Sequence, residues 1–138
     1  MSIHKQVLTS NGHVDEGMVD LLEAVWRSGI ATQFSCQGGS HYPGSPDMTQ
    51  NGNIVFASVN DGLRFMRVTM QKSWWYNRLR MTLMEPVESV LLGLDGEPRC
   101  IVEWQAIDEA TGLNVTQALT DVWCGRKPYD AYSFRRDV

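Results

Sequence analysis

Residues 15–39 decide the fold, and they read DEGMVDLLEAVWRSGIATQFSCQGG. Four apolar side chains in this stretch recur with the spacing of one helix face: Met18, Leu21, Leu22 and Val25. We therefore predict a helix over residues 15–28, with Asp15 as its N-terminal cap. Gly29 ends the helix, because glycine readily adopts the left-handed conformation that follows a helix terminus.

A strand is predicted directly after this helix, over residues 30–36. Its strand-forming side chains alternate at Ile30, Thr32 and Phe34. Residues 38–53 then contain four glycines and two prolines, which predict a long loop. Loops much longer than the usual length of roughly 4–6 residues are often functional, so this loop is a candidate part of a site.

The middle of the chain predicts a strand, a helix and a second strand. The first strand is expected over residues 53–58, and Asn60 or Ser58 then caps the helix. One face of that helix carries three apolar residues: Leu63, Met66 and Met70. Residues 80–84 alternate polar and apolar side chains, which favours a strand.

A hairpin is predicted next, formed by residues 87–94 and 99–107. Asp95 and Gly96 lie between these segments and give a strong turn signal. Three side chains of the second segment would then share one side of the sheet: Cys100, Val102 and Trp104.

The last predicted helix is indicated by a fourth periodic apolar set: Val115, Ala118, Leu119 and Val122. Asn114 or Thr111 caps it, and Gly125 ends it. Residues 129–136 alternate aromatic and polar side chains, which predicts an edge strand.

The order of these elements indicates one α+β domain spanning residues 1–138. We expect helices packed on one face of a mixed or mostly antiparallel sheet. The nearest named architecture is the ferredoxin-like split arrangement.

Composition excludes several classes of protein. Hydrophobic residues are 43% and charged residues 20% of the chain, an ordinary globular balance. The net charge of −4 disfavours a nucleic-acid partner, because such binding depends on neutralising phosphates. No apolar run approaches the roughly 18 residues that span a membrane. The first residues lack the apolar core of a signal peptide, so we expect a cytoplasmic protein.

Cysteine usage agrees with that expectation. Cys36, Cys100 and Cys124 are odd in number, far apart and form no CxxC pair. This pattern fits free thiols in a reducing compartment.

The most distinctive motif lies where the first strand ends, at Ser35, Cys36, Gln37, Gly38 and Gly39. Glycines allow backbone amides to approach a ligand closely, and successive amides can form an anion-binding nest. We therefore expect a small polar ligand or a phosphate group at this turn. The same residues also fit a tight turn around a buried thiol.

Cys36 admits two further roles. As a nucleophile it would use His41 as base and would need a lowered pKa. As a zinc ligand with His41 it would need Cys124, His4 or His13 to complete the site. The chain has no P-loop, GxGxxG, HExxH or GxSxG motif, so we predict no catalytic residue, metal or cofactor.

A second cluster combines aromatic and basic residues: Lys72, Trp74, Trp75, Tyr76, Arg78 and Arg80. Such a cluster can stack nucleic-acid bases, or form the centre of a protein interface. It can equally place one tryptophan in the core and its neighbour at the rim. Together with the aromatic tail, it favours a homo-oligomer.

A resemblance adds a biological context. The segment Gly29-Ile30-Ala31-Thr32-Gln33-Phe34-Ser35-Cys36-Gln37-Gly38 follows a helix and precedes the strand Ile54-Val55-Phe56. Residues 15–66 in this way resemble small uncharacterised proteins of actinobacterial phages and their hosts. The resemblance implies an accessory role in an infected bacterial cell, with a host protein or a nucleotide-like signal as ligand, and implies no catalytic residue. The Ser-Cys-x-Gly turn is also distantly similar, over four residues, to one in wybutosine-synthesis methyltransferases.

The leading hypothesis is a non-enzymatic binding protein. Its ligand or host partner would contact the Ser35–Gly39 turn, the loop 40–52 with His41, and the cluster from Trp74 to Arg78. The alternatives are a small cysteine-dependent enzyme using Cys36 and His41, and a nucleic-acid-binding modulator.

Overall fold

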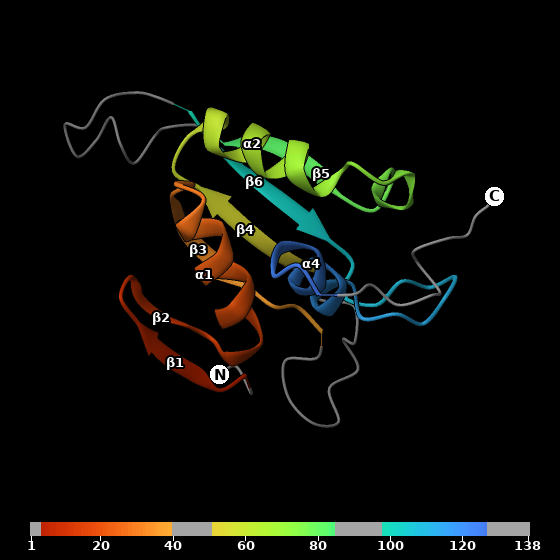
Figure 1. Cartoon of the computed structure of the whole chain (residues 1–138), viewed down its shortest axis with the longest axis horizontal. Helices are drawn as coiled ribbons and strands as arrows, with labels where there is room; N and C mark the ends of the chain where they lie inside the picture. Colours follow the sequence, from red (N-terminus) through yellow and green to blue (C-terminus); the bar gives the residue numbers. More distant parts are fainter. Residues whose placement is uncertain (1–3, 40–50, 85–97, 127–138) are drawn as a thin grey trace.

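The computed structural model describes residues 4–39, 51–84 and 98–126. Its N-terminal part is a hairpin of β1 (Gln6–Thr9) and β2 (Gly12–Asp15). A short 3-10 helix, η1 (Glu16–Met18), leads directly into α1 (Val19–Arg27). The hairpin lies beside α1 and contacts the main sheet through β2 and β3 (Figure 1).

The main sheet has four strands in the order β3 (Thr32–Cys36), β4 (Gly52–Phe56), β6 (Arg99–Trp104) and β5 (Arg80–Met84). Every neighbouring pair is antiparallel. β4 and β5 are therefore parallel to one another, with β6 between them.

Three further helical elements complete the described chain: α2 (Val59–Thr69), the 3-10 helix η2 (Ser73–Trp75) and α4 (Val115–Trp123). α2 and η2 connect β4 to β5. This connection is the split β-α-β unit found in ferredoxin-like folds. β3 occupies the remaining edge of the sheet and precedes the unit along the chain. The predicted α+β class with a mostly antiparallel sheet is confirmed.

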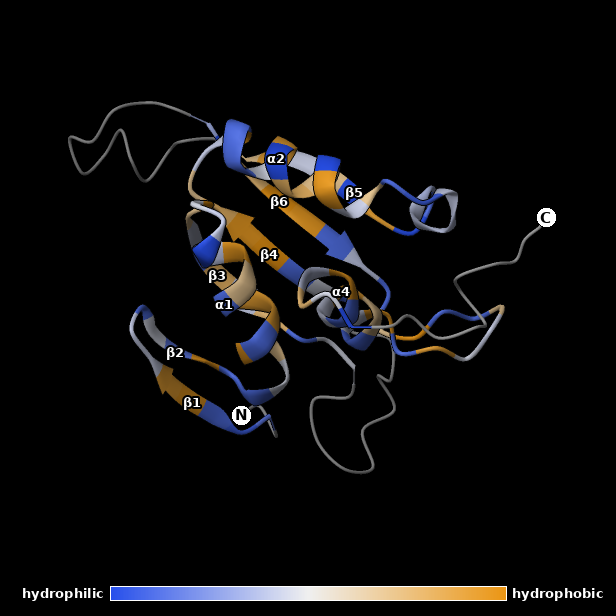
Figure 2. Ribbon diagram, in the orientation of Figure 1, coloured by the Kyte–Doolittle hydropathy of each residue, from blue (hydrophilic) through white to orange (hydrophobic). Residues whose placement is uncertain are grey.

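The core lies between one face of the sheet and the three α-helices, which share one side of it (Figure 1). Alternate side chains of β4 and β6 point into this core, as the two-residue period of a strand requires. They are at most 2% exposed: Ile54, Phe56, Cys100, Val102 and Trp104. The hydrophobic colouring of β4 and β6 in Figure 2 marks the same central strands. Burying each large side chain of this kind stabilises the fold by roughly 1.5–3 kcal/mol.

Two glycines let bulky groups fit within this core. Gly52 pairs with Trp104 across β4 and β6, and a Cβ on Gly52 would overlap the indole ring. The indole Nε1 of Trp104 donates a hydrogen bond of 2.9 Å to Oγ1 of Thr116 on α4. Gly62 of α2 faces Cys100 of β6 in the same way, so the helix packs closely on the sheet.

Most predicted elements are confirmed, with adjusted ends. The predicted helix 15–28 is η1 followed by α1, and Gly29 has the expected positive φ of 81°. The side chain of Asp15 does not cap this helix; it accepts a hydrogen bond from the amide of Gln37 instead. The strand predicted over residues 30–36 begins only at Thr32, after a turn.

The open choices of helix cap are now decided. Ser58 caps α2 by accepting a hydrogen bond from the amide of Asp61. Asn114 caps α4 by accepting one from the amide of Gln117. Both are side-chain oxygens that satisfy an amide of the first helical turn, as N-caps do.

Two pairings differ from expectation. The β1–β2 hairpin was not predicted, although Asn11 and Gly12 carry the short-range signal for it. β6 pairs with β4 and β5. Its predicted partner, residues 87–94, lies outside the described residues, as do the Asp95-Gly96 turn and the predicted edge strand 129–136.

Candidate functional site

The predicted Ser35–Gly39 turn is centred on Gln37, whose polar groups bind other parts of the fold. Its amide donates a hydrogen bond of 3.0 Å to Oδ2 of Asp15, and its carbonyl accepts one of 2.7 Å from Oγ1 of Thr116. Its side-chain Oε1 accepts a hydrogen bond of 2.9 Å from the amide of Gly17. Gln37 therefore joins β3 to η1 and α4, and its amide is not available to a ligand.

The neighbouring residues of the turn are less occupied. Gly38 is buried and Gly39 half-buried, with φ of 79° and 88°. An L side chain at either position would be strained, which explains the two glycines. Ser35 is half-buried and lies opposite Ile54 in the β3–β4 pairing. Part of the turn is exposed to solvent. The contacts of Gln37 with other parts of the fold are nevertheless sufficient to explain its geometry.

Cys36 is half-buried and is not activated as a nucleophile. Burial raises the pKa of its thiol, and the nearby carboxylate of Asp15 raises it further. A backbone interaction with Gly38 opposes this shift without cancelling it. A raised pKa leaves little thiolate at neutral pH, so the hypothesis of a cysteine-dependent enzyme gains no support. His41, its proposed base, lies outside the described residues.

The zinc hypothesis gains no support either. Cys124 is half-buried, and its Sγ lies 3.5 Å from the carbonyl oxygen of Asp20 on α1. Within residues 4–39, 51–84 and 98–126, no three His, Cys, Asp or Glu side chains are grouped so that they could hold a metal ion.

The cluster from Trp74 to Arg78 is divided between core and rim. Trp75 is 1% exposed and belongs to the core, so it has no face for a base. Trp74 packs edge-to-face on Trp75 with ring centroids 4.8 Å apart. The guanidinium of Arg78 lies 4.1 Å from the centroid of Trp74, in cation–π geometry.

Arg78 is also held by an ion pair. Its Nε donates a hydrogen bond of 3.0 Å to Oδ1 of Asp108. Burial alone would raise the pKa of Asp108, but hydrogen bonds from Thr111 and Arg78, together with the charge of Arg78, lower it overall. Arg78 thus fixes the segment that leads into α4. Its positive charge is already neutralised by Asp108.

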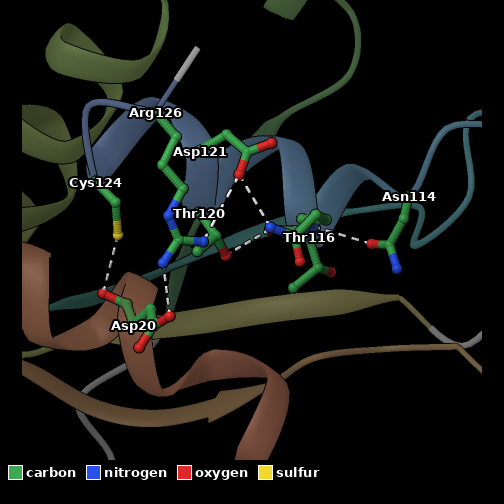
Figure 3. Close-up of polar contacts among 8 residues, drawn as sticks. Asp20, Asn114, Thr116, Thr120, Asp121, Cys124 and Arg126 are labelled. Carbon is green, nitrogen blue, oxygen red and sulfur yellow. Dashed lines mark hydrogen bonds and ion pairs between the residues drawn. The ribbon is translucent and has the colours of Figure 1, made fainter. Parts of the chain in front are cut away.

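A third polar cluster joins α1 to the end of α4 (Figure 3). Arg126 pairs with Asp20 at 2.7 Å and with the buried Asp121 at 3.8 Å. The amide of Arg126 donates to the carbonyl of Asp121, and that of Gly125 donates to the carbonyl of Val122. These two bonds form a Schellman motif, which ends α4. The cluster has a structural explanation, because Arg126 binds both carboxylates and so ties the end of α4 to α1.

An apolar groove on α2 was not predicted as a site. It has a volume of about 390 Å³ and is lined by five residues: Leu63, Met66, Arg67, Met70 and Tyr76. We call it the α2 groove. Tyr76 is 55% and Leu63 40% exposed, so large apolar groups are presented to solvent here. The periodic set Leu63, Met66 and Met70 was a signal for it in the sequence.

The orientation of α2 explains why this set is only partly buried: Met66 and Met70 pack against the core, and Leu63 is exposed. Phe65 packs on Phe56 of β4 at 5.1 Å and stacks on Trp123 of α4 at 5.2 Å between ring centroids. Gly62 and Thr69 are buried on the same side of the helix. Leu63 and Arg67 lie on the face of α2 opposite Phe65, and Met66 lies between the two faces.

β5 also presents apolar side chains to solvent, on both faces of the sheet. Leu83 is 62% and Met84 38% exposed, both large values for apolar side chains in a strand. Of the strands that the structure describes, only β6 pairs with β5. A sheet edge of this kind presents backbone N–H and C=O groups that another chain can pair with.

The same region is basic within an acidic chain. Residues 59–84 contain five Lys or Arg and one Asp, a formal charge of +4, whereas the whole chain has −4. The one acid, Asp61, is bound by Ser58 and Arg64. Arg67 and Lys72 are exposed and form no ion pair within the described part of the chain.

Comparisons with known proteins identify no relative. No protein-family model matches the chain, and neither a curated protein nor a solved structure matches it significantly. The resemblance to phage proteins therefore stays a prediction. In the described ranges, the helices are too short or too polar to cross a bilayer.

Proposed function

We propose that this protein is a non-enzymatic binding protein and that the α2 groove is its contact surface for a protein partner. The observation that carries the proposal is the exposure of Leu63 and Tyr76 on a groove also lined by Met66, Met70 and Arg67. Tyrosine, methionine and arginine are enriched where proteins bind one another. Methionine also adapts its shape to different partners.

The groove has more support than the Ser35–Gly39 turn as the principal contact. The amide of Gln37 already binds Asp15, whereas the side chains of the groove are presented to solvent. A small polar ligand at the turn, with loop 40–52 and His41, stays a second proposal, since Ser35, Cys36 and Gly39 are partly exposed. Nucleotide stacking has less support because Trp75 is buried and Arg78 covers Trp74.

A position-specific crosslinking experiment tests the groove. A photoreactive phenylalanine analogue replaces Leu63, and the full-length protein is irradiated in cells that naturally contain it. We expect one defined protein adduct, identified by mass spectrometry. The matched control places the same analogue at Leu8, which is 71% exposed on the separate β1–β2 hairpin. Equal labelling at both positions, or no adduct at position 63 of a correctly folded protein, would reject the groove as the contact surface.

A predicted homo-oligomer is tested in the same preparation. Light scattering gives the molar mass, and an adduct between two copies of the chain at position 63 would identify the partner as a second subunit.

A further inference from the structure

We infer that the α2 groove receives an extended, acidic segment of the partner, which adds as a strand to the edge of β5 that no described strand covers. The inference rests on the proposed function and specifies its partner. It depends on three features that occur together: the edge of β5, the apolar flank of α2 and the excess of positive charge around them.

The first feature is the position of β5 beneath α2. Met81 of β5 pairs with Val102, and Leu83 pairs with Cys100; both partners point into the core. Met81 and Leu83 therefore lie on the helix side of the sheet. A Cβ on Gly62 would lie 3.5 Å from the sulfur of Met81, which shows that α2 packs against this strand.

The second feature is the space that an added strand would occupy. It would lie about 4.8 Å beyond β5, and its alternate side chains would point to the helix side. There they would meet Leu83 and the flank of α2 that carries Leu63 and Met66. Backbone pairing with an edge strand, combined with pockets for alternate side chains, is an established mode of peptide recognition. A helical partner would use the groove but leave the edge of β5 unused.

The third feature is charge. Arg67 lines the groove, and Lys72 begins the turn that contains Tyr76. Neither forms an ion pair in the ranges that the structure describes. An acidic segment would place carboxylates near these two groups, whereas a basic segment would be repelled by them.

A peptide series tests the partner's charge. The probe is a capped, fluorescent peptide in which glutamate alternates with leucine or valine, and fluorescence anisotropy measures its binding to the full chain. We expect saturable binding that weakens at least about tenfold when lysine replaces every glutamate. The double variant Arg67→Glu, Lys72→Glu should reverse this preference. The control Arg27→Glu changes an exposed charge on α1 and should leave binding unchanged.

Backbone methylation tests the extended conformation. Methylating alternate amides of the acidic peptide removes donors from one edge of a strand only. We expect one methylated set to abolish binding and the other set, shifted by one residue, to retain it. Loss of binding with both sets would indicate a helical occupant and overturn the inference.

Two further outcomes of the peptide series would also overturn the inference. The first is equal binding of the acidic and basic peptides, and the second is an acidic peptide that fails to bind at millimolar concentration. Should the crosslink at position 63 still form in that case, the groove would remain the contact surface and only the acidic strand would be rejected. A partner found by crosslinking should contact the groove through an acidic segment of alternating apolar residues.

Discussion

Gly62 of α2 lies directly against the thiol of Cys100 in β6, so closely that a Cβ on Gly62 would overlap the sulfur. Cys100 is fully buried, and its Sγ lies 3.6 Å from the carbonyl oxygen of Ser58 at the start of α2. This contact sets the height of α2 above the sheet. The same contact therefore influences where the α2 groove lies relative to the edge of β5.

Replacing Gly62 with alanine should therefore destabilise the protein. Alanine favours a helix by about 1 kcal/mol over glycine, but overpacking a core costs roughly 1–3 kcal/mol. We expect the overpacking to prevail and the free energy of unfolding to fall, as measured by urea denaturation. The double variant Gly62→Ala, Cys100→Ala should recover part of the loss, because the overlapping sulfur is gone. Strictly additive effects of the two changes would contradict the contact.

Thr116 should be sensitive to loss of its hydroxyl. This group accepts a hydrogen bond from Trp104 and donates one to the carbonyl of Gln37, both in the interior. Thr116→Val leaves both groups without their partner and should lower the free energy of unfolding by about 2–4 kcal/mol. Thr116→Ser keeps the hydroxyl and is the matched control. If the two variants are equally stable, the hydroxyl contributes nothing.

Cys36 should react slowly with thiol reagents. Its pKa is raised by burial and by Asp15, so the thiolate is scarce at neutral pH. We expect the labelling rate of Cys36 in the folded protein to stay below that of an unfolded control at neutral pH, and the midpoint of its increase with pH to lie above the ordinary thiol pKa of 9.0. Replacing Asp15 with asparagine should lower the thiol pKa. Fast, selective labelling near pH 7 would instead revive the nucleophile hypothesis.

The ion pair between Arg78 and Asp108 should make stability depend on acid pH. The pKa of Asp108 in the folded protein lies below its ordinary value of 3.8, so the charged form stabilises the fold. That contribution is complete above the unfolded pKa and is lost as the pH falls through the folded pKa. Asp108→Asn should remove this part of the pH dependence, measured as the free energy of unfolding across acid pH.

The same pair can be observed directly by NMR titration of the Asp108 carboxyl carbon. Arg78→Gln removes a hydrogen bond and a positive charge, so the carboxyl pKa should rise. Lys72→Gln removes the same charge from an exposed residue nearby and should leave that pKa unchanged. A titration that does not respond to Arg78→Gln would show that the pair contributes little.

Local patterns predicted the elements of this fold well. The apolar sets of α1 and α4, the stop at Gly29 and the alternation of Cys100, Val102 and Trp104 all depend on neighbours within a few residues of the chain. Such signals can be read from a short stretch of sequence without knowledge of the tertiary structure. The β1–β2 hairpin was missed because its strands are short and half-exposed, although Asn11 and Gly12 carried a usable turn signal.

The candidate site depended on information that a local pattern does not contain. Gln37 was assigned to a ligand site because nothing in its own segment revealed that Asp15 and Thr116 occupy its polar groups. Leu63, Met66 and Met70 gave a helical period, but a period alone does not say which flank of a helix faces the core. Phe65 decided that question by packing on Phe56 and Trp123.

The sequence by itself therefore determined the helices, most of the strands, the caps of α2 and α4 within two alternatives each, and the α+β class. Tertiary structure alone decided which apolar face of α2 stays partly exposed, which strand lies at the edge of the described sheet, and which polar groups of the turn are already bound. The physical reason is the range of the interactions. Helix periodicity and capping act between residues up to four positions apart, whereas burial and hydrogen-bond occupancy depend on groups that only folding brings together.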